Sequence, residues 1–397
     1  MLNKEDDKMD EIVKKEECTG CKMCADICPK QAIIFKDNEE GFWYPSIDEN
    51  KCIDCGLCKK RCPSLQKIKS ENSLEPKVYA GWTLDEQIRY ESTSGGIYYE
   101  LAKKFIENDG YIVGCVFSDD YKSAKHIVGN DLATLRKIMG SKYFQSDTAG
   151  IYIKLKELIN AGEKVLFCGT PCQIAAVISF FDTIPKKLYF LDFICKGINS
   201  PLAYKAYMEE LEIKYNSPIE EVRMKSKKTG WESLATHVQF QNGKEYHKDR
   251  YTDWWIQGYT CGNLFMRENC QNCQYKQLPR LADISFGDFW GIKGCESAEY
   301  EKGISVIIVN SKKGKELLRS IEGKMHLELR NMEEVLEGNP YFMGQATAHS
   351  NRKLFFDLLR KEPFSKAVKG SYTETAEQKM KRWIKFFLKH VCGRKKW

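Results

Sequence analysis

The sequence predicts an α/β (α+β) protein in which an N-terminal ferredoxin-like dicluster module precedes a mixed-sheet α/β body and a C-terminal helical tail. Two clustered cysteine runs predict the module, and alternating strand and helix patterns after residue 78 predict the body. A basic, helix-periodic C-terminus predicts the tail. The expected divisions are an arm at 1–17, the module at 18–64, a polar linker at 65–77, body domains at 78–160 and 161–325, and a helical region at 326–397.

The module is predicted from cysteine spacing alone. Two runs each follow C-x2-C-x2-C-x3-C-P, which is typical of bacterial two-cluster ferredoxins. The fourth cysteine of each run serves the cluster of the other run. Zinc knuckles match less well, because zinc sites use two pairs of cysteines. We therefore expect one 4Fe-4S cluster on Cys18, Cys21, Cys24 and Cys62, and a second on Cys52, Cys55, Cys58 and Cys28.

The body is predicted from the order of its apolar segments. Residues 165–169 and 188–195 are strand-like, and a helical stretch at 173–181 separates them. A strand, a helix and a strand in succession favour parallel pairing. Asn242-Gly243 between two alternating segments predicts a β-hairpin.

Charge and composition narrow the class of protein. The chain has 397 residues, 17 cysteines and a formal charge of +7, but residues 379–397 hold eight Lys or Arg and no acid. Without them the charge is −1, so we expect no nucleic-acid partner. The N-terminus has no apolar signal core, and so many cysteines in a cytoplasmic protein favour metal binding over disulfides. We expect a cytoplasmic location.

Four further cysteines predict a third metal site. Cys172 and Cys195 follow the C-terminal ends of two adjacent strands, and this edge of an open α/β sheet is where ligands bind. A loop-like C-x2-C adds Cys270 and Cys273. We expect a third 4Fe-4S cluster here, with zinc as the rival metal and buried structural thiols as the alternative for the first pair. Alternative ligands are Cys168 and Cys261.

The stretch Ser-Thr-Ser-Gly-Gly at 92–96 precedes a helix. Backbone N–H groups at a helix N-terminus suit a phosphate, although Ser94 could equally be a simple N-cap. The sequence holds neither G-x-G-x-x-G nor a Walker A motif.

Several motifs in order resemble one family. The double ferredoxin run, STSGG (92–96), GSKYFQSD (140–147), GTPCQIA (169–175), CKGINSP (195–201), CQNC (270–273) and ADISFGDFWG (282–291) are similar to those of the coenzyme F420 hydrogenase/dehydrogenase beta-subunit family, in its bacterial form with a fused dicluster ferredoxin. The likeness covers roughly residues 18–315.

The resemblance implies an FAD site and an additional 4Fe-4S cluster. Position by position, Cys172, Cys195, Cys270 and Cys273 match the family's recurrent cysteines. Lys142 and Asp288 are the candidate catalytic residues, for moving a proton or positioning the flavin. The implied flavin-binding residues are Thr93, Ser94, Gly95, Gly96, Ser141, Lys142, Gly169, Thr170, Pro171, Gln173 and Asp283.

The stretch 379–391 places apolar side chains on one helical face and basic ones elsewhere. Such a helix is typical of an anionic membrane interface, and a helix packed on the body is the alternative. We therefore expect peripheral contact with the inner membrane face.

Two functions follow as hypotheses. The first is an FAD- and iron–sulfur-dependent oxidoreductase that passes electrons between its clusters and a small-molecule hydride donor or acceptor, with a redox protein or ferredoxin as partner. The alternative is a non-catalytic electron-transfer subunit of a partner enzyme, with a link to surface-polysaccharide synthesis.

Overall fold

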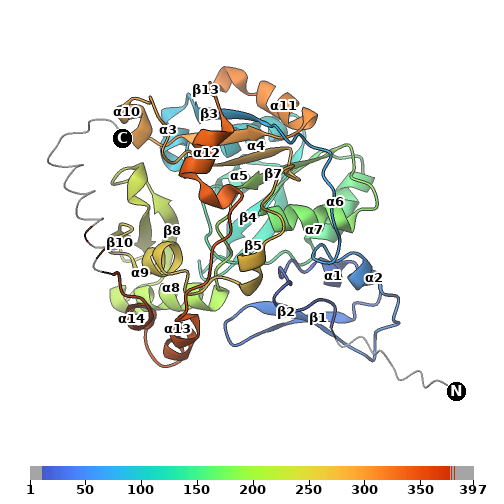
Figure 1. Cartoon of the computed structure of the whole chain (residues 1–397), viewed down its shortest axis with the longest axis horizontal. Helices are drawn as coiled ribbons and strands as arrows, with labels where there is room; N and C mark the ends of the chain where they lie inside the picture. Colours follow the sequence, from blue (N-terminus) through green and yellow to red (C-terminus); the bar gives the residue numbers. More distant parts are fainter. Residues whose placement is uncertain (1–10, 376, 378–379, 381–397) are drawn as a thin grey trace.

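The N-terminal module is the small unit at the lower right of Figure 1. The computed structural model describes residues 11–375, 377 and 380. Strands β1 (Ile33–Asp37) and β2 (Trp43–Ile47) pair antiparallel, and the short helices α1 (Met23–Asp26) and α2 (Leu57–Lys60) lie beside the body. Each helix follows a residue of positive φ, Lys22 at 59° and Gly56 at 66°, which turns the cysteine-bearing loop into the helix. The ferredoxin-like module is confirmed.

The body is built on one eight-stranded mixed sheet. The strand order is β13-β3-β12-β11-β7-β6-β4-β5. The central four strands, β4 (Tyr111–Phe117), β6 (Val165–Gly169), β7 (Leu188–Phe193) and β11 (Ile284–Asp288), are parallel. The antiparallel outer strands are β3 (Lys77–Thr83), β5 (Ala124–Gly129), β12 (Ser305–Val309) and β13 (Met325–Arg330). The parallel pairing of β6 and β7 confirms the β-α-β prediction.

Helices cover both faces of this sheet. On one face the core contains residues of α4 (Ile97–Glu107), α5 (Leu132–Ile138) and α11 (Lys312–Arg319). On the other face it contains residues of α6 (Ile151–Asn160) and α7 (Pro171–Phe180). Helix α7 begins with a proline in its first turn, where the missing N–H costs nothing. This layering sends the loops that follow β4, β6, β7 and β11 to one edge of the sheet.

A smaller unit packs beside that edge. Strands β8 (Ile219–Ser226), β9 (Ala235–Phe240) and β10 (Glu245–Lys248) form an antiparallel sheet, and the predicted hairpin is present, with Gly243 at φ 78°. Its aromatic core involves α8 (Pro201–Tyr215), α9 (Trp254–Ile256), α13 (Arg352–Leu359) and α14 (Phe364–Ser371). The remaining helices are α3 (Glu86–Glu91), α10 (Ser297–Glu301) and α12 (Met332–Gly338).

Two expected divisions of the body do not coincide with structural ones. Strands from 78–160 and 161–325 alternate within one sheet, and β13 from the expected helical region 326–397 joins it too. The linker also lies on the body, because Asn72 Nδ2 donates to the carbonyl oxygens of Arg280 (2.8 Å) and Ala282 (3.0 Å).

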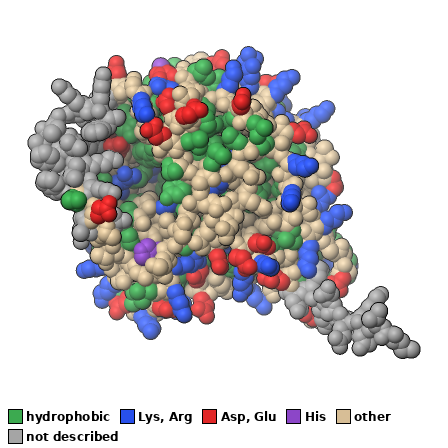
Figure 2. All heavy atoms as spheres, in the orientation of Figure 1, with side chains coloured by type: hydrophobic (Ala, Val, Ile, Leu, Met, Phe, Trp, Pro, Cys, Tyr) green, Lys and Arg blue, Asp and Glu red, His purple; other side chains and the backbone are tan. Residues whose placement is uncertain are grey.

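The surface carries mixed charge. Figure 2 shows acidic and basic side chains interspersed over this face of the molecule. Within the described part of the chain, no helix has the length and apolar character needed to cross a bilayer. The expected amphipathic helix at 379–391 lies outside the described residues, apart from Met380.

Candidate redox centre

The eight module cysteines form two groups. Burial raises the pKa of Cys24, and the charges of Cys21, Cys18 and Cys62 raise it further, with a smaller effect from Cys58. Cys18 and Cys62 also pack in one buried cluster. We expect Cys18, Cys21, Cys24 and Cys62 to form one ligand group. We call them the inner set. The other group lines one small cavity and is called the outer set: Cys28, Cys52, Cys55 and Cys58. The outer set consists of the four cysteines that the spacing predicts for the second cluster. Cys55 is exposed, whereas three members of the inner set are buried.

The inner set lies against the body. Thr148 Oγ1 and Tyr152 Oη, near the start of α6, both donate to the carbonyl oxygen of Cys21, at 2.6 and 2.7 Å. Arg267 is fully buried, and its guanidinium donates to the carbonyl of Cys18 at 2.9 Å and to Gln145 Oε1 at 3.0 Å. These contacts hold the module so that its buried cluster-binding loop faces the body.

The structure brings together the four body cysteines. Burial raises the pKa of Cys172, and the charges of Cys273, Cys195 and Cys270 raise it further. We call Cys172, Cys195, Cys270 and Cys273 the third set. They come from three segments separated by 20 residues or more of sequence. Among residues 11–375, 377 and 380, no three His, Cys, Asp or Glu side chains are arranged around a single metal ion. In a 4Fe-4S cluster each cysteine binds its own iron.

Local geometry prepares these thiols to be ligands. Cys172 is the second residue of α7, where the helix dipole favours a thiolate. The backbone N–H of Ile198 donates to Cys270 Sγ at 3.3 Å. A Cβ on Gly197 would come within 2.3 Å of Met266 Sδ and 3.4 Å of Cys270 Cβ. Glycine is therefore needed for the backbone after Cys195 to approach Cys270.

Two buried tyrosines contact cysteine-bearing segments. Tyr152 Oη donates to the carbonyl oxygen of Cys21 in the inner set, at 2.7 Å. Tyr275 packs in one cluster with Cys172 and Cys270 of the third set. Burial raises the pKa of both hydroxyls, and the charges of Cys21 and Cys172 raise them further. Each ring is therefore within electrostatic reach of one thiol from each set.

A cavity of about 470 Å³ borders the third set at Cys195. It is large enough for a cofactor-sized ligand. Cys195 lines it, and so do many of the implied flavin-binding residues: Thr93, Ser94, Gly96, Ser141, Lys142, Gly169, Thr170 and Gln173. Tyr98 Oη also lines the cavity and is a buried hydroxyl without a partner in the described residues. A buried polar group in that state points to a ligand that would satisfy it.

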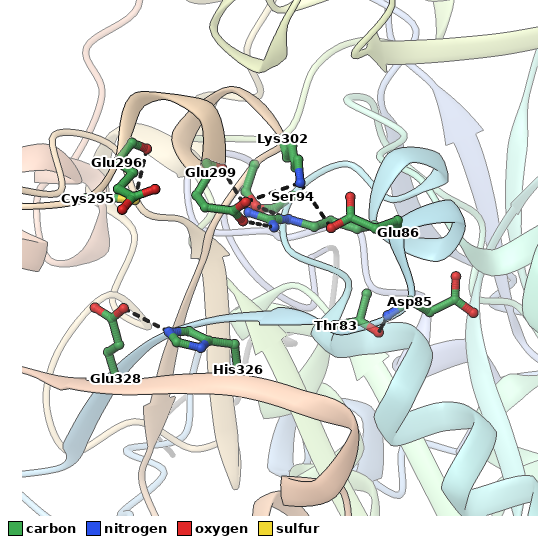
Figure 3. A network of polar contacts seen from close by, with 12 residues as sticks. Thr83, Asp85, Glu86, Ser94, Cys295, Glu296, Glu299, Lys302, His326 and Glu328 are labelled. Carbon is green, nitrogen blue, oxygen red and sulfur yellow. Dashed lines mark hydrogen bonds and ion pairs between the residues drawn. The ribbon is translucent and has the colours of Figure 1, made fainter.

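Hydrogen bonds to the rest of the body fix the 92–96 loop. Lys227 Nζ donates to the carbonyl oxygens of Arg89 and Ser94, both at 2.5 Å, and Ser94 Oγ donates to the carbonyl of Ile304 at 2.8 Å. Figure 3 shows Ser94 beside a network in which Lys302 bridges Glu299 and Glu86, at 3.1 and 3.0 Å. The loop is therefore fixed just before α4, and Ile97, Tyr98 and Tyr99 in the first turn of that helix line the cavity.

The two candidate catalytic residues line the cavity but are already engaged. Lys142 Nζ donates to the carbonyls of Ile138 and Met139, both at 2.9 Å, and burial lowers its pKa to about 8. Asp288 forms an ion pair of 2.6 Å with buried Lys225 and accepts a hydrogen bond from Trp231 Nε1 at 3.2 Å.

Three implied flavin-binding residues do not line the cavity. The prediction for Asp283 needs correction, because it precedes β11 and lies at the opposite edge of the sheet from Asp288. There it accepts hydrogen bonds from the Phe190 N–H at 2.8 Å and from Ser311 Oγ at 2.5 Å. The Gly95 N–H donates to Ser305 Oγ at 2.9 Å, and Pro171 is buried in the first turn of α7. All three act within the fold.

The alternative ligands stand apart from the third set. Burial raises the pKa of Cys168, and the charges that act on it are those of Asp192, Cys115 and Lys142. Cys261 is exposed at the end of the π-helix Gln257–Cys261. Neither thiol is among those whose charge raises the pKa of Cys172, so the third set remains the proposed ligand set.

Some contributors were not foreseen from sequence. Tyr98 closely follows the STSGG stretch, and this position in the sequence could have identified it as a residue of the site. Arg267 precedes the CQNC motif. Arg267 could be recognised only from its contact with a module more than 200 residues away.

Two parts of the chain match known protein families. Residues 162–335 match the family model that describes the C-terminal part of the coenzyme F420 hydrogenase/dehydrogenase beta subunit. The chain carries that domain of the beta-subunit family. Residues 17–65 match the 4Fe-4S dicluster domain, so ferredoxin-type clusters belong to the module. The family resemblance inferred from the motifs is confirmed.

Three known proteins are similar to this chain. A coenzyme F420-dependent sulfite reductase of Methanocaldococcus jannaschii is 24% identical over 352 residues, which is 83% of this chain and 50% of the reductase. This chain thus spans half the length of that relative. An uncharacterized ferredoxin of the same organism is 42% identical over 53 residues, 13% of this chain and 68% of its own. A chain of the F420-reducing NiFe hydrogenase complex from Methanosarcina barkeri aligns with 81% of this chain and 96% of its own length, at 20% identity and a TM-score of 0.44.

Proposed function

We propose that this chain is an FAD- and iron–sulfur-dependent oxidoreductase, which passes electrons between the ferredoxin-type clusters of its module and a hydride donor or acceptor in the body cavity. The observation that carries the proposal is the convergence of four body cysteines. Cys172, Cys270 and Cys273 pack in one cluster, and Cys195, whose charge acts on Cys172, lines the cavity. Four thiols suit a third 4Fe-4S cluster. The proposed order is outer set, inner set, third set, cavity.

The cavity residues suit a flavin. A bound FAD would supply the chemistry that exchanges a hydride for two single electrons. The fixed loop at 92–96 and the open first turn of α4 would take the phosphates, as helix N-termini do. Tyr98 Oη, unpartnered in the cavity wall, would donate to a polar edge of the ring.

Lys142 and Asp288 are assigned positioning roles in this proposal. Lys142 holds the turn after α5 through carbonyls that end the helix, and its ammonium places positive charge beside the cavity. Asp288 fixes Lys225, whose ammonium lies 4.5 Å from the centre of the Trp290 ring. Both side chains shape and charge the cavity wall while being held by other groups, which favours orientation of a ligand over proton transfer.

A second candidate is an electron-transfer subunit without its own substrate. It is favoured by one observation: the F420-dependent sulfite reductase is twice as long as the matched region, so a further component could carry the final reaction. A cavity of about 470 Å³ favours the first candidate, because a pure relay needs no such space.

The test uses anaerobically purified full-length chain. We expect one flavin and about twelve irons per chain, and rapid bleaching of the cluster absorbance when reduced coenzyme F420 or a nicotinamide donor is added. Cys172→Ser is expected to hold about eight irons and to keep its module clusters oxidised while the flavin is reduced. Cys295→Ser, at a half-buried thiol outside all three sets, is the control. Iron without flavin, and no response to any hydride donor, would favour the relay subunit.

A further inference from the structure

Buried cations surround the third set of cysteines unequally. Arg280 is 1% exposed and pairs with Asp192, also 1% exposed, at 3.1 Å. Lys276 is 5% exposed, yet no carboxylate among the described residues lies within ion-pair distance of its ammonium. Its nitrogen donates only to backbone carbonyls, those of Lys196 at 2.9 Å and Gly344 at 3.4 Å. A buried charge normally has a charged partner, so this ammonium needs one.

The candidates for that partner are the thiols of the third set. Lys276 Nζ lies 2.9 Å from the carbonyl oxygen of Lys196, the residue that follows Cys195. Only Gln274 and Tyr275 separate Lys276 from Cys273 in the sequence, and Tyr275 packs in one cluster with Cys172, Cys270 and Cys273. The hydrogen bond of Lys276 therefore ties the CQNC loop to the chain beside Cys195, and it places the ammonium at the third set.

We propose that Lys276 is the counter-charge of the third cluster and sets its reduction potential above the value that the thiolates alone would give. This inference rests on the proposed function, since it requires a 4Fe-4S cluster at the third set. With four thiolates such a cluster carries about two negative charges when oxidised and about three when reduced. Reduction would add one electron, supplied by a reduced inner cluster or by a hydride donor through the flavin, and would leave the four Fe–S(Cys) bonds intact. A fixed positive charge nearby stabilises the reduced form more than the oxidised form.

Lys276 is a positioning residue, and a purely structural role would make a different prediction. Its hydrogen bonds to two carbonyls could tie the loops together without any effect on potential. Lys276→Gln separates the two roles, because the amide still donates hydrogen bonds but carries no charge. Lys276→Arg keeps the charge. Lys313→Gln is the matched control. Like Lys276, Lys313 donates from Nζ to a backbone carbonyl, in this case that of Leu188 at 2.9 Å, and its ammonium lies 5.0 Å from the centre of the Tyr189 ring. Lys313 lies at the opposite edge of the sheet from the third set.

The experiment is a redox titration of the anaerobic full-length chain, followed by electron paramagnetic resonance and accompanied by iron analysis. At the wild-type midpoint, we expect the ratio of reduced to oxidised third cluster to fall about tenfold in Lys276→Gln, which corresponds to about 59 mV for a one-electron couple. Lys276→Arg and Lys313→Gln should titrate as the wild type does. An unshifted third cluster in Lys276→Gln, with about twelve irons retained, overturns the inference and leaves the proposed function standing.

A second variant, Asp192→Asn, should shift the reduction potential in the opposite direction, and it tests the inference even if Lys276→Gln loses the third cluster. Asp192→Asn leaves the positive charge of Arg280 unpaired, and the Arg280 charge already acts on Cys195. Its third cluster should titrate at a more positive potential than the wild type. An unchanged or more negative value contradicts the charge argument. About eight irons in the wild type would overturn the proposed function itself, and this inference with it.

Discussion

The module and the body hold cysteine sets of the same size by different means. In the module, two runs within residues 18–62 carry every ligand, and short turns at Lys22 and Gly56 direct them. In the body, the third set comes from the start of α7, the end of β7 and the loop before β11. Local spacing defines the first arrangement, whereas the parallel sheet defines the second. We therefore expect changes in the packing of the body to disrupt metal binding at the third set and to leave metal binding at the inner and outer sets unaffected.

The largest expected effect is that of Gly197→Ala. The added Cβ would come within 2.3 Å of Met266 Sδ, so the backbone after Cys195 would move away from Cys270. We expect the iron content to fall from about twelve to about eight per chain, with the module clusters retained. Anaerobic iron analysis measures this. Gly323→Ala has open space around its Cβ and is the control. Loss of all iron would show that the two regions depend on each other more than the comparison allows.

The boundary between the two regions is expected to depend on Arg267. Arg267→Met would leave the carbonyls of Cys18 and Trp43 and the amide oxygen of Gln145 without this buried donor. With a cost of about 1–3 kcal/mol for each unsatisfied group, the free energy of unfolding should fall by about 3 kcal/mol or more. Denaturant unfolding measures the loss, and faster bleaching of module clusters by a chelator would locate it. Arg223→Met, on the surface beside Glu221, should change neither.

The body alone should show an acid-dependent stability that arises at Asp253. Burial raises the pKa of this carboxyl from 3.8 to about 6, while Tyr207 and Tyr246 donate to it at 2.6 and 2.9 Å. Between pH 4 and 6 the folded chain then binds more protons than the unfolded chain, so its stability falls as pH rises through this window. The whole effect is about 2–3 kcal/mol.

Asp253→Asn should remove this part of the pH dependence. The substitution can also change the free energy of unfolding by the same amount at every pH, and such a change does not affect the slope. Denaturant unfolding followed by tryptophan fluorescence, at several pH values between 4 and 7, gives the slope of stability against pH. A variant whose stability changes with pH as the wild type does would place the titration elsewhere. The module absorbance serves as the internal reference, because Asp253 has no contact with it in the described structure.

The smallest expected effect concerns the segment that joins the regions. Asn72→Ala removes two hydrogen bonds to the carbonyls of Arg280 and Ala282, and should lower stability by about 1–2 kcal/mol. Limited proteolysis should then cut within 65–77 more readily. Asn50→Ala, on an exposed module turn, should leave the cleavage rate unchanged. Equal cleavage of both variants would show that the linker is held by other contacts.

The same contrast explains what could be predicted from sequence. Cysteine spacing is sufficient for the module, and alternating strand and helix patterns are sufficient for the parallel pair β6–β7. The third set could be suggested because two cysteines follow parallel strands. The position of β3 between β13 and β12 could not be predicted, because antiparallel partners at the sheet edge depend on long-range packing. The misplacement of Asp283 has a local origin: Asp283 precedes β11 and Asp288 ends it, so the two carboxylates lie at opposite ends of the strand.

The most direct test of the account is the number of irons and flavins in anaerobically purified chain. Convergence of the third set beside the cavity predicts about twelve irons and one flavin per chain. About eight irons, all removed by disrupting the module runs, together with no bound flavin, would contradict it.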